Sequence, residues 1–183
     1  MNKIKSIISV FVLALLVFNS CDDFNGKAYE QKHQAIQKCI NESDFKGAHE
    51  VLASITPVSS RHKKSEIADY KFDELQMIVY RAEIRYLVDQ NDDASWKRAF
   101  FLIQEYKNSQ DYPPRNYEYK LELSRSLMEY ALSFEHEETA NSIRNYMNRL
   151  SREIGSRMGE CSGFRDHDYT VLIQQADDIA SMY

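Results

Sequence analysis

Apolar residues recur every three or four positions along most of the chain, the spacing that places them on one face of an α-helix. No long alternation of apolar and polar residues, the pattern of a β-strand, interrupts this spacing. Gly and Pro, which disfavour helix interiors, number only five and three. The pattern therefore predicts an all-α fold.

The apolar stripes and the polar breaks between them place a series of helices. They cover about residues 28–41, 45–55, 65–88, 95–106, 117–134, 136–158 and 169–183. Asp44, Ser65, Ser95, Asn116 and Asp168 are the expected N-caps, since their side chains can accept a hydrogen bond from a free backbone N–H. Pro113 and Pro114 mark the clearest break, because proline disrupts a helix interior.

Each stripe also predicts which side chains face inward. In the longest helix these include Tyr70, Leu75, Ile78, Ala82 and Tyr86. The expected inward residues of the later helices are Trp96, Ala99, Leu102, Ile103, Tyr106, Leu121, Met128, Ala131, Leu132, Ala140, Ile143, Met147, Leu150, Ile154, Leu172, Ala176, Ile179 and Tyr183. Gly159 is the expected stop of the sixth helix.

An internal repeat is visible when Ala48, Ala99 and Ala140 are superimposed. Apolar residues then coincide three and seven positions later, and each alanine lies in the second helix of a predicted hairpin. A small residue at this point lets the two helices of a hairpin approach closely. The repeat predicts stacked hairpins over about residues 28–150.

This arrangement resembles the tetratricopeptide repeat family, in which an early alanine in the second helix is followed by large apolar residues. The separations here exceed the about 34 residues of that family. The resemblance implies a short solenoid of antiparallel hairpins, a capping helix at about residues 169–183, and a concave groove that binds a peptide or helix. An irregular antiparallel bundle is the alternative, because any helical hairpin can produce similar matches.

The first two dozen residues have the organisation of an export signal. Lys3 and Lys5 precede an apolar run from Ile7 to Phe18. This run is shorter than the about 20 residues that span a bilayer and has the size of a signal-peptide core. Residues 1–20 are therefore predicted to be a signal peptide, with a single helical domain over residues 28–183.

The stretch Val17-Phe18-Asn19-Ser20-Cys21 resembles the lipobox of bacterial lipoproteins. The resemblance implies that Cys21 becomes the lipidated first residue and that residues 21–27 form a short tether. It also implies a lipid-anchored location in the bacterial cell envelope, most simply at the outer membrane. The alternatives are a plain secretory signal, after which Cys21 would pair in a disulfide, and an uncleaved anchor.

Cys39 and Cys161 are the two cysteines that remain if Cys21 is lipidated. In an oxidising compartment they are candidates for a disulfide, whereas Cys39 can equally be a small buried side chain. Arg165 to Asp168 surround His167 with carboxylates, but adjacent residues rarely converge on one metal ion, and no zinc-like spacing accompanies them. No metal or cofactor is therefore predicted.

Charge and motifs narrow the class of function. The formal net charge is −5 and no basic block occurs, which argues against nucleic acid as a partner. No motif for a nucleophilic serine or for a phosphate-binding loop is present, so a non-enzymatic protein is expected. We expect a scaffold for another protein, with a surface lipoprotein that binds glycan or another nutrient as the alternative.

The twelve tyrosines are the most unusual feature of the composition. Tyr112, Tyr117 and Tyr119 flank the Pro-Pro break, and a tyrosine offers a rigid apolar face with a polar tip to a partner. These three are the candidate partner surface. The alternative is that the tyrosines fill gaps between helices.

Overall fold

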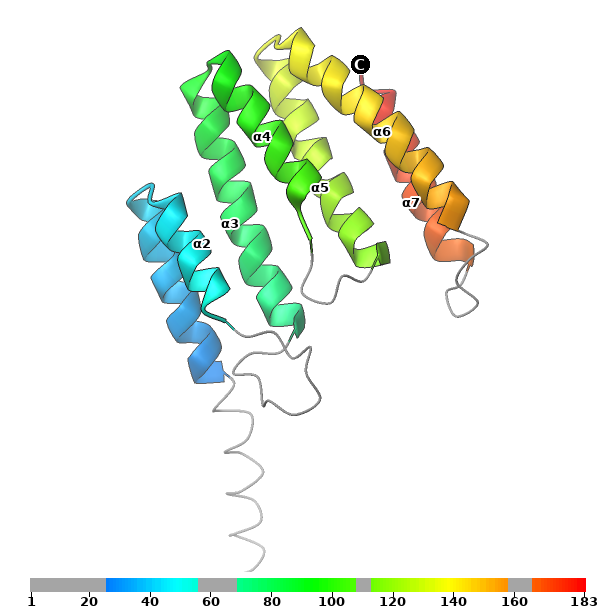
Figure 1. Ribbon diagram of the computed structural model, residues 1–183. Coiled ribbons are helices and arrows are strands. Elements are labelled where there is room, and N and C mark those ends of the chain that lie inside the picture. The colour runs from blue at the N-terminus through cyan, green and yellow to red at the C-terminus, as the bar shows by residue number, and fades with distance from the viewer. Residues whose placement is uncertain (1–25, 56–68, 108–112, 158–165) are drawn as a thin grey trace, which may run out of the picture. The chain divides into compact units, whose positions relative to one another are not determined.

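The computed structural model describes residues 26–55, 69–107, 113–157 and 166–183 (Figure 1). Within these ranges the regular secondary structure is entirely helical, which confirms the predicted all-α fold. The predicted signal peptide, Cys21 and most of the tether lie outside the described residues. Ser65, Tyr112, Gly159 and Cys161 lie outside them as well.

Contacts divide the chain into two compact units, Met1–Gln76 and Met77–Tyr183. The sequence pattern predicts a single domain over residues 28–183. The boundary falls inside one long helix, α3 (Asp69–Gln90), so the ends of that helix belong to different units.

The first unit contains a helical hairpin made of residues 26–41 and α2 (Phe45–Ala53). Ile36, Ala48 and Leu52 are buried. The first turns of α3 contact the first helix, because the Lys71 ammonium lies 5.2 Å from the centre of the Tyr29 ring. Burial, reinforced by the nearby carboxylate of Glu74, raises the pKa of Tyr29.

Gly47 lies beneath the N-cap of α2. The Asp44 carboxylate accepts a hydrogen bond from the Gly47 N–H at 2.9 Å, and a β-carbon on Gly47 would collide with that carboxylate. Gly47→Ala should leave the free energy of unfolding nearly unchanged, because a gain of about 0.5–1 kcal/mol in helix propensity offsets a cap worth about 1 kcal/mol. In an Asp44→Ala background the same change should stabilise by about 0.5–1 kcal/mol. Urea titrations of the four proteins measure this coupling, and equal effects in both backgrounds would contradict it.

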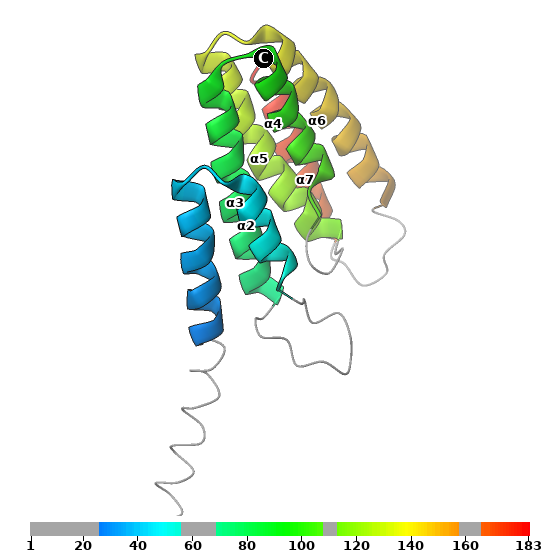
Figure 2. The same ribbon diagram turned by 60° about the vertical axis from the view of Figure 1, so that its left-hand side comes forward.

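The second unit comprises the C-terminal part of α3 and four further helices, α4 (Asp93–Glu105), α5 (Pro113–Ser133), α6 (Glu137–Arg157) and α7 (Asp166–Ala180). α4 and α6 form one layer and α5 and α7 form the other (Figure 1). α5 and α7 run in the same direction, opposite to α4 and α6 (Figure 2).

The helices of the second unit are stacked in sequence order. α4 packs against α5 and α6, α5 against α6 and α7, and α6 against α7, whereas α4 and α7 make no contact through their described residues. α3 contacts α4 through the rings of Tyr80 and Tyr106, and α5 through the ion pair of Arg81 with Glu122. Each helix thus meets the next and the one after it, as in an open stack of hairpins.

Most of the predicted inward residues are buried, including every one predicted in α4. Four are exposed instead: Tyr70, Tyr86, Leu132 and Tyr183, with exposed fractions of 59%, 40%, 38% and 40%. The prediction was wrong for these four. In α3 the buried residues include Leu75, Met77, Val79, Ile84 and Val88, which occupy more than one face. A single stripe cannot describe such a helix.

Three predicted helix starts are also wrong. α4 is capped by Asp92 rather than Ser95, and the Ser95 N–H donates to the Asp92 carboxylate, which lowers the pKa of Asp92. α5 begins at Pro113 rather than after Asn116. Backbone N–H groups in the first turn of a helix have no partner within the helix, so a proline, which lacks this group, is tolerated there. α7 begins at Asp166, so Asp168 lies within its first turn.

The three described hairpin turns share one conformation. Ser43, Asn91 and Glu135 have positive φ angles of 56°, 51° and 54°. Each is followed by the N-cap of the next helix. Asp44, Asp92 and His136 accept from the N–H three residues ahead, at 2.9, 3.0 and 3.3 Å. The turn is therefore a structural repeat.

This turn corrects the register of the internal repeat. Four residues after the caps lie Ala48, Trp96 and Ala140, so Trp96, and not Ala99, is the structural equivalent of the two alanines. The sequence superposition was shifted by one helical turn in the second hairpin. Spacings of three and four recur along any amphipathic helix, so apolar matches alone do not distinguish one turn from the next.

Candidate functional site

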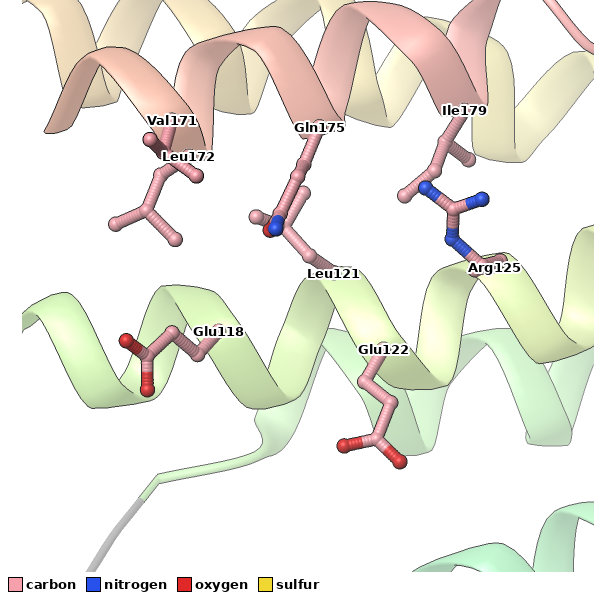
Figure 3. A pocket seen from close by; sticks show the side chains of 8 residues that line it. All are labelled: Glu118, Leu121, Glu122, Arg125, Val171, Leu172, Gln175 and Ile179. Carbon is pink, nitrogen blue, oxygen red and sulfur yellow. The ribbon is translucent and has the colours of Figure 1, made fainter. Parts of the chain in front are cut away.

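A groove of about 510 Å³ lies between α5 and α7. Figure 3 shows the eight side chains that line it. Four come from each helix: Glu118, Leu121, Glu122 and Arg125 from α5, and Val171, Leu172, Gln175 and Ile179 from α7. The groove is therefore lined by two helices that run side by side.

The floor of the groove is apolar. Leu121, Leu172 and Ile179 belong to the predicted inward stripes and are almost fully buried, because they also hold α5 and α7 together. Val171 differs from them, since 42% of its surface is exposed. It is the apolar side chain that an occupant of the groove could most readily cover.

Charged side chains occupy the α5 side of the groove. The guanidinium of Arg125 extends from α5 toward α7 and lies beside Ile179, whereas Glu122 points away from α7 and Glu118 extends along α5 (Figure 3). Glu122 forms an ion pair with Arg81 of α3. Gln175 extends from α7 toward α5 (Figure 3). The groove thus combines an apolar floor with a cation, an amide and two carboxylates.

The groove offers an occupant apolar contact together with charged and amide side chains. Its described lining residues include neither a serine or cysteine nucleophile nor a histidine. Both walls are helices, so their backbone N–H and C=O groups are already bonded within each helix except at the ends. An occupant would therefore be recognised by side chains alone.

A smaller hollow of about 200 Å³ lies where α4 ends and α5 begins, beside the end of α6. The Tyr117 hydroxyl donates to the Glu153 carboxylate at 2.8 Å, and Arg157 lies 3.8 Å from the same carboxylate. The Lys120 ammonium donates to the carbonyl of Gln104 at 3.0 Å, near the end of α4. These contacts join the ends of three helices.

Two residues of the predicted tyrosine surface, Tyr117 and Tyr119, lie in this packed region. Tyr117 is only 5% exposed, and Tyr119 is half-buried with its ring 5.5 Å from that of Tyr106. Tyr112 lies outside the described residues. Tyr117 and Tyr119 therefore fill the space between helices, as the alternative interpretation of the tyrosines expects.

Tyr117 and Tyr146 both resist ionisation. Burial raises the pKa of Tyr146 to about 12, and burial together with the hydrogen bond to Glu153 raises that of Tyr117. The charge of Glu153 contributes to both shifts. Because the unfolded chain loses these protons from about pH 10 upward, the folded state binds more protons than the unfolded state between about pH 10 and 12.

The free energy of unfolding should therefore fall as the pH rises through this window. Glu153→Gln removes the negative charge but keeps a hydrogen-bond acceptor, so the pKa of each tyrosine should move toward its ordinary value. We expect a shallower fall in stability for this variant. Urea titrations at several alkaline pH values, with phenolate absorbance recorded in parallel, measure the slope; the same slope in both proteins would contradict the assignment.

The remaining predicted sites are less fully described. Cys39 is half-buried on the first helix, and its predicted partner Cys161 lies outside the described residues. Cys21 also lies outside them, so lipidation and the disulfide stay predictions. Arg165 lies outside the described residues, as do the side chains of Asp166, His167 and Asp168.

Metal-binding and membrane-spanning features can be assessed for the same ranges. The described residues contain no group of three His, Cys, Asp or Glu side chains placed to hold a metal ion. Among the described helices, none is both long and apolar enough to span a membrane.

Sequence reasoning did not identify the groove. Its floor residues were predicted to face the core, and its charged residues carried no motif. One signal was present in α5, because Glu118, Glu122 and Arg125 recur at spacings of four and three and so share one face. That face lines a groove only because α7 lies beside it.

Comparison with known proteins gives no match to this chain among protein family models, curated proteins or solved structures.

Proposed function

We propose that this protein is a non-enzymatic lipoprotein of a bacterial cell envelope that binds another protein through its helical second unit. The groove between α5 and α7 is the observation that carries the proposal. Its walls are rigid helices, its exposed Val171 offers apolar contact, and Arg125 and Glu118 offer charges that can select a partner. The tetratricopeptide resemblance implies a concave groove that binds a peptide or a helix.

Sequence supports the anchored part of the proposal. Lys3 and Lys5 precede an apolar run that ends shortly before Cys21, the order found in a lipoprotein signal peptide. Several acyl chains on one cysteine would hold a protein at a membrane far more firmly than a single chain. The partner would then be met close to the membrane surface.

Protein binding is favoured over glycan binding at this groove. Sugars are commonly bound against an aromatic ring, and the described lining residues of the groove include no aromatic side chain. Glycan or nutrient binding elsewhere on the chain remains the alternative.

A photocrosslinking amino acid at Val171 tests the proposal in intact cells. We expect an adduct with a second protein, because Val171 is the exposed apolar side chain of the groove. The matched control is the same amino acid at Phe101, which is 46% exposed on α4 in the other layer. Failure to form an adduct at Val171, or the same adduct at Phe101, would exclude the groove as the binding site.

The anchor is tested separately with Cys21→Ala. If lipid on Cys21 holds the protein at the membrane, this variant should leave the membrane fraction, and labelled fatty acid should no longer be incorporated. Labelling that persists in the variant would show that Cys21 is not the lipidated residue.

A further inference from the structure

We propose that the occupant of the α5–α7 groove is an amphipathic helix with an acidic residue for Arg125 and a basic residue for Glu118. These two residues would lie about two turns apart on a helix whose apolar face also covers Val171, which lies at the Glu118 end of the groove (Figure 3). The inference rests on the proposed function, because it specifies the partner of the same groove. The occupant is a helix of a partner protein.

The walls of the groove favour a helix over an extended segment. A strand needs a sheet edge to bond its backbone, and α5 and α7 present side chains rather than unpaired backbone groups along the groove. A helix bonds its own backbone and can lay an apolar face on the floor. The helix is therefore the form of polypeptide that leaves the fewest polar groups unsatisfied there.

Arg125 selects an acidic group. Within the described residues its guanidinium makes no hydrogen bond or ion pair, although it extends into the groove beside Ile179 (Figure 3). A guanidinium binds a carboxylate through two parallel N–H···O bonds, which fixes geometry as well as charge. Burial of this arginine beneath an occupant would be costly unless the occupant supplied such a group.

Glu118 selects a basic group at the other end. Glu122 lies between the two and is already paired with Arg81, whereas Glu118 forms no ion pair within the described residues. Seven residues separate Glu118 from Arg125, which is about 10.5 Å along the helix at 1.5 Å per residue. Complementary charges on a partner helix would thus also be about two turns apart.

A second copy of the chain does not match this groove through α5. The exposed row of α5 places Glu118, Glu122 and Arg125 toward solvent, so it brings charges and no apolar side chain to cover Val171. The occupant is therefore not α5 of a second copy.

The test uses three synthetic helical peptides with one leucine stripe and two variable positions two turns apart. The variable positions carry Glu and Lys, two Glu, or two Lys. Binding to the full chain in detergent is measured by fluorescence anisotropy. The native protein should prefer the Glu and Lys peptide by about tenfold, Arg125→Glu should prefer the two-Lys peptide, and Glu118→Arg should prefer the two-Glu peptide. This design holds for either direction of the helix, since only the pair of charges matters.

The control variant is Arg152→Glu, which makes the same charge change on an exposed part of α6. It should keep the native preference. A preference that does not follow the charges of the groove, or no binding of any peptide, would overturn the inference. A Val171 crosslink to a protein in cells would still support the proposed function in that case, so the two failures are distinguishable. A crosslink to a second copy of the chain would also overturn the inference.

Discussion

Trp96→Ala is expected to lower the free energy of unfolding by about 3–5 kcal/mol. Trp96 is fully buried, and its ring stacks on His136 with centroids 4.7 Å apart and meets Phe134 edge-on at 5.9 Å. Its indole N–H donates to the side chain of Asn91 at 3.3 Å. One side chain thus joins the turn before α4 to the turn before α6, so its removal leaves a cavity and loosens two turns.

Urea denaturation followed by circular dichroism measures this effect. The control is Phe101→Ala on the same helix, which removes an aromatic side chain that is 46% exposed and should cost much less. Trp96→Phe, which keeps a ring but loses the hydrogen bond, should fall between the two. Equal losses for Trp96→Ala and Phe101→Ala would show that Trp96 does not join the turns as described.

Ala140→Leu should also destabilise strongly, by about 1–3 kcal/mol. Ala140 is 1% exposed in the first turn of α6 and belongs to the core of the second unit. Well-packed interiors have no room for three further carbon atoms, so α6 must shift or the leucine must adopt a strained rotamer. Leucine is a good helix former, so helix propensity does not account for the expected loss of stability. The loss comes from the close packing around α6.

Ala94→Leu on the exposed side of α4 is the matched control, because it makes the same change where space is open. Its effect on the free energy of unfolding should be within about 0.5 kcal/mol. The difference between the two variants isolates the contribution of packing. Stability that is unchanged in Ala140→Leu would mean that close approach does not require an alanine there.

The sequence predicted the helices better than their beginnings. Trp96, Ala99, Leu102, Ile103 and Tyr106 are all buried as expected, because the spacing of large apolar residues directly encodes one helical face. The cap of the same helix was misplaced by three residues. Asp92 and Ser95 are both good caps, and the choice between them depends on the backbone of the preceding turn at Asn91.

His136 lies at a helix start that the sequence indicated, but its role as the N-cap was not predicted. Its ring accepts from the Thr139 N–H at 3.3 Å while it stacks on Trp96 of the preceding hairpin. Histidine is not among the preferred N-caps. The ring is held in the capping position by Trp96, which is distant in sequence, so local propensity carried no signal for it.

By itself, the sequence determined the all-α fold, most buried faces and the order of the hairpins, because these follow from local spacing and helix propensity. Only the tertiary structure decided that Trp96 is the equivalent of Ala48 and Ala140, and that Tyr117 is buried. It also decided that Arg125 and Val171 line one groove. The physical reason is that a groove belongs to two helices at once, and the pattern along one helix does not specify which face of another will lie beside it.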